Sequence, residues 1–125
     1  NSDVLFAELR GDGMWWDKLT VAGGMAGFAS YFLTGVPGEM KLDKLYVHPR
    51  LQRRGYGGMM IARAGEVARS SGCSRLVLAV NKNNHSAIAA YLKHGFRIAD
   101  AVMKDIGGGF VMDDYLMVKP VTGGE

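Results

Sequence analysis

The 125-residue sequence lacks several features that would mark a secreted or membrane protein. Its one cysteine, Cys73, cannot form an internal disulfide, so a reducing, cytoplasmic environment is expected. No apolar run approaches the roughly 20 residues that cross a bilayer, and no signal-peptide pattern opens the sequence. No repeat or linker divides it. We therefore expect one globular domain over residues 1–125, with a frayed tail over residues 119–125.

The excess of positive charge is also small, with 15 Lys and Arg against 12 Asp and Glu. Arg50, Arg53 and Arg54 lie close together beside Tyr56, but no series of aromatic residues alternates with them. This pattern favours an anionic ligand over a nucleic-acid partner. The spacing of His, Cys and carboxylate residues is not typical of a metal site, so we expect none.

Hydrophobic periodicity and glycine-rich turns predict the first elements. A short helical pattern covers Asp3–Leu9. Two apolar runs, Lys18–Ala22 and Met25–Leu33, flank the glycines at positions 23 and 24 and predict a β-hairpin. A third strand is expected over Met40–Val47.

The second half alternates between helices and strands. The sequence predicts a helix from about Gly58 to Gly72, a strand over Leu76–Val80, a helix from the Asn84 cap to Lys93, and strands over residues 96–106 and 110–119. This order indicates an α+β domain with helices packed on a mixed sheet.

The segment Gln52-Arg53-Arg54-Gly55-Tyr56-Gly57-Gly58, between a strand and a helix, is suited to holding phosphate. The first amides of a helix have no partner within it, and glycines let a phosphate approach them closely. The segment has no Gly-Lys-Ser/Thr of a P-loop, and Met60 stands where a dinucleotide fingerprint needs a third glycine or alanine. A glycine-rich turn with solvated arginines is the alternative interpretation.

Two motifs together resemble those of the GCN5-related N-acetyltransferase (GNAT) superfamily. The first is Leu45-Tyr46-Val47-His48-Pro49 followed by the glycine segment, and the second runs from Asn84 through Ala87 and Tyr91 to Gly95-Phe96. Ala90 replaces the usual leucine of the second motif. The final segment, from Asp105 to Met117, resembles an uncharacterised bacterial branch of this superfamily. The likeness extends over about residues 19–119.

This resemblance implies a fold and a coenzyme. The fold is a mixed, mostly antiparallel twisted sheet with helices on both faces, here with the N-terminal strand and first helix shortened or missing. The coenzyme is acetyl-CoA, and no metal is needed. Its expected contacts are the strand Leu45, Tyr46 and Val47, the loop residues Gln52, Arg53, Arg54, Gly55, Tyr56, Gly57 and Gly58, and the helix residues Asn84 and Tyr91.

The chemistry is expected to depend on Tyr91 and Asp43. Tyr91 lies two helical turns after Asn84, on the same face, and the resemblance implies that it protonates the departing thiolate. A core aromatic residue is the alternative. Asp43 is the candidate base, with a solvated ion pair to Lys41 or Lys44 as the alternative. His48 is expected to serve structure or phosphate binding, and His85 and His94 are expected on helix surfaces.

The sequence therefore predicts an acetyl-CoA-dependent N-acetyltransferase acting on a primary amine. Asp105, Asp113 and Asp114 in the last hairpin favour a small cationic amine as the acceptor. A non-catalytic acyl-CoA-binding module and a peptide or protein N-acetyltransferase are the alternatives. No nucleic-acid or membrane partner is expected, and the sequence is compatible with a homodimer.

Overall fold

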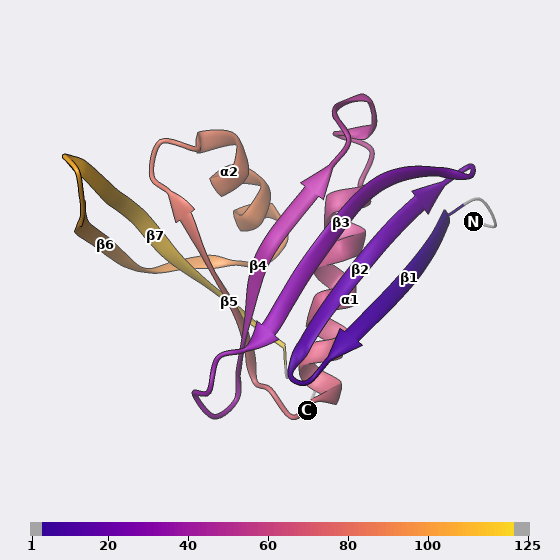
Figure 1. Cartoon of the computed structure of the whole chain (residues 1–125), viewed down its shortest axis with the longest axis horizontal. Helices are drawn as coiled ribbons and strands as arrows, with labels where there is room; N and C mark the ends of the chain where they lie inside the picture. Colours follow the sequence, from indigo (N-terminus) through magenta and orange to yellow (C-terminus); the bar gives the residue numbers. More distant parts are fainter. Residues whose placement is uncertain (1–3, 122–125) are drawn as a thin grey trace.

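The computed structural model describes residues 4–121. In this range seven strands form one sheet in the order β1-β2-β3-β4-β5-β7-β6, with two helices packed against it (Figure 1). The elements are β1 (Val4–Gly11), β2 (Met14–Val21), β3 (Gly24–Leu33), β4 (Glu39–Val47), α1 (Tyr56–Ser70), β5 (Arg75–Asn81), α2 (His85–Lys93), β6 (Arg97–Gly107) and β7 (Phe110–Pro120). A short 3₁₀ turn, Pro49–Leu51, precedes α1. Every strand pair is antiparallel except β4–β5, so the expected α+β fold is confirmed.

The helix expected over Asp3–Leu9 is wrong, because β1 pairs with β2 along its whole length. Val4 and Phe6 are partly buried, whereas Leu5 and Leu9 are mostly exposed. This alternation has the period of a strand, and strand β2 supplies the backbone partners that a helix would have found within itself. The N-terminal strand is therefore present, while no helix precedes β2 within residues 4–121.

The next hairpin turns one residue earlier than expected. Ala22 and Gly23, both with positive φ, form the turn, and Gly24 already belongs to β3. Two central residues with positive φ match the twist of the flanking strands in a two-residue hairpin.

Both helices lie on one face of the sheet, in contrast to the expectation of helices on both faces. Leu78 of β5 and Met117 of β7 are opposite each other and buried, while the next pair, Ala79 and Leu116, is exposed. The face that carries Met117 also carries Lys119, whose ammonium donates to the carbonyl of His94 at the end of α2 (2.7 Å). The other face has no helix within the described part, and the segment that was expected to be helical near the start of the sequence is strand β1.

Strands β4 and β5 diverge soon after they meet. They pair only from Glu39–Arg75 to Lys41–Val77, and β4 has a bulge at Asp43 in its pairing with β3. The rest of β4 therefore has β3 on one edge and an opening on the other. A parallel pair that splits in this way leaves backbone donors and acceptors unpaired along the opening.

The last two strands form the long β6–β7 hairpin, which extends beyond the helix-covered core (Figure 1). Its turn uses three glycines, at positions 107–109, all with positive φ. Lys119 and Pro120 belong to β7, so the tail does not begin at 119; residues 122–125 of that expected tail lie outside the described range. Neither helix in the described part is long and apolar enough to span a membrane.

Candidate functional site

A groove of about 800 Å³ lies where β4, the start of α1 and α2 come together. We call it the α1–α2 groove. It is lined by Leu45, Val47, Leu51, Gln52, Arg53, Gly55, Gly57, Gly58, Ile61, Asn84, Ser86, Ala87, Ala90, Tyr91, Lys93 and His94. The two sequence motifs, almost forty residues apart at their centres, thus form opposite walls of one groove.

The glycine segment forms the start of α1 with its amides uncapped. Gly55, in the left-handed region (φ 87°), is the N-cap, and no side chain caps the helix. Arg53 also has positive φ (67°), an uncommon conformation for a residue with a Cβ. The first turn of α1 has no acidic residue. The free amides and the positive end of the helix dipole therefore remain available to an anion.

The unpaired edge of β4 faces the groove. The His48 amide donates to the Ala26 carbonyl of β3 (2.7 Å), so by strand alternation the backbone groups of Leu45 and Val47 point away from β3. One of them has a partner, since the Gln52 side-chain amide donates to the Val47 carbonyl (3.2 Å). Gln52 thereby ties the loop to the strand. The remaining groups of this edge can pair with an extended ligand.

Helix α2 supplies the other wall. Asn84 is its N-cap, and the side-chain oxygen of Asn84 (Oδ1) accepts a hydrogen bond from the Ala87 amide (3.3 Å). Tyr91 lies two turns further on, with its ring edge-on to Phe96 at 5.5 Å between centroids. Burial raises the pKa of the Tyr91 phenol above its ordinary value, so the hydroxyl keeps its proton well into the alkaline range.

The groove has basic but no acidic side chains. Arg53, Lys93 and His94 line it, and no Asp or Glu among the described residues does so. An anionic ligand would therefore meet attraction without a like-charged neighbour.

Four of the expected site residues do not line the groove. Tyr46 lies on the opposite face of the sheet, stacked on Phe28 (5.4 Å between centroids). Tyr56 packs against the core, and Arg54 is exposed. Asp43 is exposed and forms an ion pair with Lys44 (3.2 Å), which was the alternative to its role as a base. Its part in proton transfer stays a prediction.

His94 was expected on a helix surface, and the structure instead places it in the groove. Its imidazole lies against Gly58 at the start of α1. The spacing of Asn84, Ala87, Tyr91 and His94 repeats every three to four residues, so it continues the stripe that the motif defines. This continuation of the stripe is the sequence feature from which the position of His94 could have been predicted. No sequence pattern predicts that Leu51, Ser86 and Lys93 line the groove, because the geometry of the loop and of the crossover brings them there.

His48, the histidine that was expected near the loop, makes a structural contact. His48 Nδ1 accepts a hydrogen bond from the Arg50 amide (3.1 Å) and caps the 3₁₀ turn.

Cys73 is buried, and its burial raises the pKa of the thiol, so the thiolate is disfavoured. Within residues 4–121 no group of three or more His, Cys, Asp or Glu side chains is arranged to hold a metal ion.

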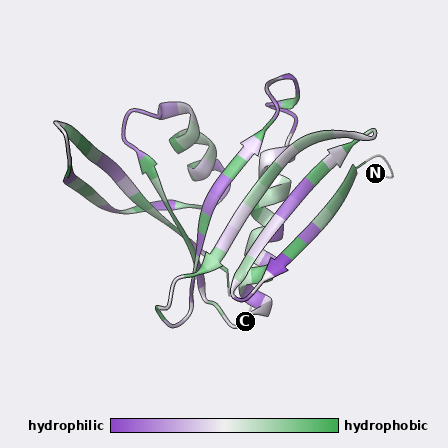
Figure 2. Ribbon diagram, in the orientation of Figure 1, coloured by the Kyte–Doolittle hydropathy of each residue, from purple (hydrophilic) through white to green (hydrophobic). Residues whose placement is uncertain are grey.

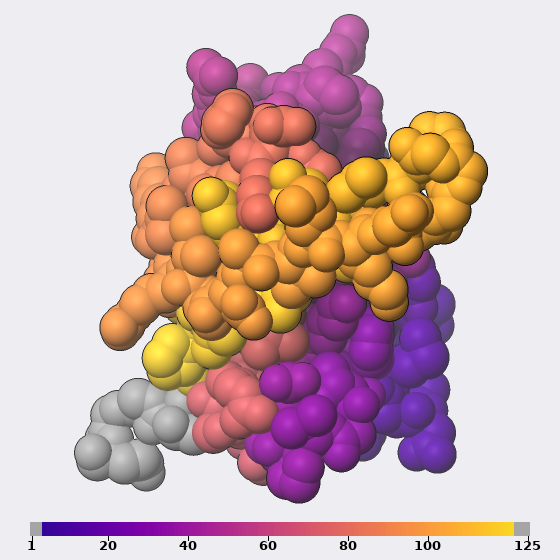
Figure 3. Space-filling view, turned by 90° about the vertical axis from the view of Figure 1, so that its left-hand side faces the viewer, coloured from indigo at the N-terminus to yellow at the C-terminus, as the bar shows by residue number. Residues whose placement is uncertain are grey.

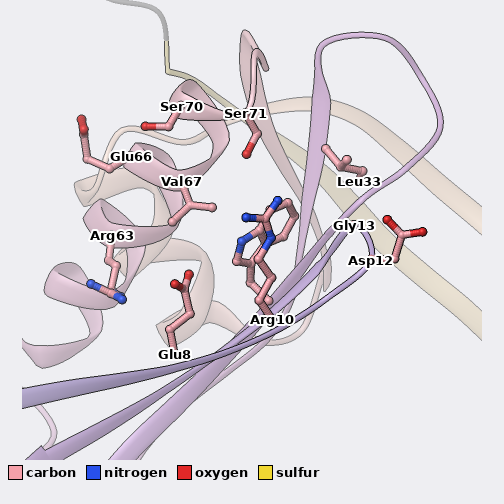
Figure 4. Close-up of a pocket in the computed structure, with 11 residues that line it drawn as sticks. Glu8, Arg10, Asp12, Gly13, Leu33, Arg63, Glu66, Val67, Ser70 and Ser71 are labelled. Carbon is pink, nitrogen blue, oxygen red and sulfur yellow. The ribbon is translucent and has the colours of Figure 1, made fainter.

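A second cavity of about 610 Å³ lies between the β1–β2 hairpin and α1, and none of the expected site residues lines it. Figure 4 shows Arg10 at its centre, with Glu8 and Arg63 on one side and Asp12 on the other. The Arg10 guanidinium stands over the ring of the buried Trp15 (5.3 Å to the centroid). Acidic and basic groups thus alternate around this cavity, so it does not select one sign of charge.

A buried polar network lies beneath this second cavity. Asp17 has no exposed side-chain surface; it accepts a hydrogen bond from the Tyr31 hydroxyl (2.7 Å) and pairs with Arg63 (3.2 Å). Burial first, and then the bond to Asp17, raise the pKa of Tyr31 far above its ordinary value. The network ties β2 and β3 to α1, which indicates a structural role.

The acidic hairpin is partly neutralised. Asp113 forms a 2.6 Å ion pair with Lys82, whose ammonium also stands over the Tyr115 ring (5.6 Å). Asp114 lies opposite Val102 in β6, on the other face of β7 from Asp113. The two carboxylates therefore have different surroundings.

The sequence model of the acetyltransferase (GNAT) family matches residues 2–96, more than half of the chain. A curated relative, thialysine N-epsilon-acetyltransferase of Sus scrofa, is 28% identical over 99 residues. That alignment covers 67% of this chain and 58% of the relative, so the chain spans less than two thirds of the relative's length.

Solved structures share the fold. The ribosomal-protein-S18-alanine N-acetyltransferase from Escherichia coli superposes with a TM-score of 0.75 at 27% identity, over 93% of this chain and 74% of that one. A GNAT family acetyltransferase from Elizabethkingia anophelis, solved with acetyl-CoA bound, has a TM-score of 0.79 at 12% identity, over 96% of this chain and 99% of that one. The second likeness shows the fold alone.

Proposed function

Because the chain belongs to the acetyltransferase (GNAT) family, we propose that it is an acetyl-CoA-dependent N-acetyltransferase acting on a primary amine. One observation carries this proposal. Uncapped helix amides, an unpaired strand edge and Tyr91 lie along a single groove, and no Asp or Glu of residues 4–121 lines it. Each of these features matches one part of a coenzyme A thioester: pyrophosphate, pantetheine arm and leaving sulfur.

The residues present fit the coenzyme. The amides from Arg53 to Gly58 hold the pyrophosphate, helped by the positive end of the α1 dipole. The open edge of β4 at Leu45 and Val47 pairs with the amides of the pantetheine arm, as an added strand would. Asn84 keeps its side-chain amide nitrogen for the arm, since its oxygen already caps α2. When bound, acetyl-CoA supplies an activated acetyl group.

The chain's own contribution to the chemistry is proton transfer and exclusion of water. A partly buried, protonated Tyr91 donates its hydroxyl proton to the departing sulfur. The acceptor nitrogen must lose a proton to attack, because a free alkylamine is mostly protonated at neutral pH. Asp43, at the bulge where β4 leaves β5, is the proposed base; it would act through water, since its side chain is turned to Lys44.

We further propose a small cationic amine as the acceptor. The relative from Sus scrofa is named for a small amine, thialysine, and the last hairpin here carries Asp113 and Asp114. The Escherichia coli neighbour, named for the alanine of a ribosomal protein, supports a peptide amine as the competing acceptor.

A thiol-release screen tests both parts of the proposal. Acetyl-CoA is incubated with the protein and with polyamines, amino acids, amino-sugars or peptides, and free coenzyme A is measured. We expect turnover with at least one small cationic amine, reduced in a Tyr91→Phe variant. Turnover with peptides alone would contradict the acceptor class but not the enzyme.

The second candidate is a module that binds acyl-CoA without catalysis. Two observations favour it: no Asp or Glu of residues 4–121 lines the groove, and Asp43 lies outside it, paired with Lys44. Coenzyme binding by calorimetry together with no thiol release across the panel would establish it.

A further inference from the structure

Strand β6 is the last strand of the sheet, and one of its edges has no strand partner within residues 4–121. Figure 3 shows the β6–β7 segment, in orange to yellow, lying across the outside of the molecule. Several of its large apolar side chains are more than half exposed: Met103, Ile106, Phe110 and Val111. Figure 2 shows hydrophobic and hydrophilic stretches following one another along this hairpin. An exposed apolar edge strand of this kind is a ready partner for another strand.

The regular part of β6 is short and its outward backbone groups can be identified. Bulges interrupt the pairing with β7 near Ile98 and near Gly107, which leaves Asp100–Asp105 in regular register. The Ala101 amide donates to the Asp100 carboxylate (2.8 Å) instead of to β7. The amide of Ala101 is therefore on the outer edge, and the period of two places the backbone groups of Met103 there as well.

These outward groups restrict how a second β6 could pair with the first. In an antiparallel pair, residues opposite each other both point their backbone groups toward the partner or both away. A two-fold axis must therefore pass through a residue and not between two residues. Within the regular stretch, an axis at Ala101, Val102, Met103 or Lys104 keeps at least three residues in register.

Charge selects among these registers. An axis at Val102 places Asp100 opposite Lys104 of the other copy, and Lys104 opposite Asp100, with Val102 facing itself. An axis at Ala101 or Met103 places Val102 opposite one of these two charges and leaves the other without a charged partner. An axis at Lys104 places the two Lys104 side chains opposite each other. Opposite charges facing each other across strands stabilise the pair, whereas like charges destabilise it.

We propose that β6 is the interface of a homodimer, in which two copies join antiparallel about Val102 into one continuous sheet. The Ala101 amide then donates to the Met103 carbonyl of the second copy, and the Asp100 carboxylate is released to Lys104. Charged side chains on an edge strand normally prevent it from pairing with other strands. Here the order of the charges along β6 allows pairing in one register. No residue of β6 lines the α1–α2 groove, so this surface is separate from the proposed function.

Charge reversal tests the register in the full chain. We expect the wild type to dimerise in sedimentation equilibrium, and Asp100→Lys or Lys104→Asp to weaken the dimer at least about tenfold, because each change acts twice in a two-fold pair. The double variant Asp100→Lys with Lys104→Asp restores opposite charges and should restore the dimer. Lys18→Asp changes an exposed side chain on β2, far from β6 in the order of strands; it is the matched control and should leave the dimer intact.

Cysteine cross-linking gives a second, independent test. Val102→Cys places two thiols face to face across the axis and should form a disulfide-linked dimer under mild oxidation. Met103→Cys, facing Ala101, should form far less, and the native Cys73 is buried. A monomeric wild type at about 0.1 mM, a double variant that fails to recover, or equal cross-linking at 102 and 103 would each overturn the proposal.

Discussion

The imidazole of His94, at the end of α2, lies against Gly58 in the first turn of α1: a Cβ at position 58 would stand 2.5 Å from Cε1 of the ring. A Cβ at the neighbouring Gly57 would meet only Val47 Cγ2, at 3.8 Å, which is an ordinary contact. The contact between His94 and Gly58 fixes the distance between the two walls of the groove.

We expect Gly58→Ala to lower the free energy of unfolding by about 1–2 kcal/mol, because the added methyl group must displace the His94 ring. Gly57→Ala is the matched control and should be neutral or stabilising, since alanine is the better helix former. Urea unfolding of both variants measures the difference. Adding His94→Ala to Gly58→Ala should recover the loss; equal effects at positions 57 and 58 would contradict the contact.

Gly57→Glu tests where the coenzyme phosphates bind. The new carboxylate would lie at the start of α1, where the proposed pyrophosphate meets the helix amides. We expect the affinity for acetyl-CoA to fall at least about tenfold in calorimetry, with Gly57→Ala as the folded control. Unchanged affinity in a folded Gly57→Glu protein would place the phosphates elsewhere.

Tyr91→Phe should reduce kcat by roughly ten- to a thousandfold while leaving coenzyme affinity nearly intact, as expected for losing a general acid. Because burial raises the pKa of this phenol, the wild type keeps more of its proton donor at pH 10, where an ordinary tyrosine is half ionised. The alkaline decline of kcat attributable to Tyr91 should therefore have its midpoint above about pH 10 and be absent from the Phe variant. Turnover of Tyr91→Phe equal to that of the wild type would show that Tyr91 serves core packing and not proton transfer.

Tyr31→Phe should change how stability depends on pH. The folded pKa of Tyr31 lies above its unfolded value of about 10, so its contribution is complete below that pH and is lost as the pH rises further. We expect the wild type to lose stability above pH 10 with a slope of up to about 1.4 kcal/mol per pH unit from this group, and the variant to have a shallower slope.

The same variant should also be less stable at pH 8, by about 1–3 kcal/mol, because the buried Asp17 loses its hydroxyl donor. Urea unfolding between pH 8 and pH 11 provides both measurements. Tyr91 and Cys73, whose pKa values burial also raises, leave a residual slope in the variant. Identical slopes in the two proteins would show that Tyr31 ionises normally in the folded state.

Asp114→Asn should lower kcat/KM for a polyamine relative to a neutral amine by roughly three- to tenfold, since the carboxylate attracts a cation. Asp113→Asn should have a smaller effect, because Lys82 already neutralises that carboxylate. The ratio of the two specificity constants is the measurement. An unchanged ratio in both variants would show that the acidic hairpin does not select the acceptor.

Several local features could be predicted because they are encoded by neighbouring residues. The helix after Gly55 and the helix capped by Asn84 follow from glycine, cap and apolar stripe in one short segment, and both are confirmed. The β6–β7 hairpin follows in the same way from its three glycines. The prediction for Asp3–Leu9 was wrong because the segment is so short that its apolar residues are consistent with either a helical or a strand period.

The sequence by itself determined the chemical groups of the site: the glycine loop, Asn84, Tyr91 and their order along the chain. Only the tertiary structure decided which of them meet. The divergence of β4 from β5 opens the edge at Leu45 and Val47, the crossover through α1 and α2 brings His94 to Gly58, and strand alternation turns Tyr46 away from the groove. Pairing and crossover join residues that are distant in sequence, and no local pattern encodes which partner a strand or helix will find.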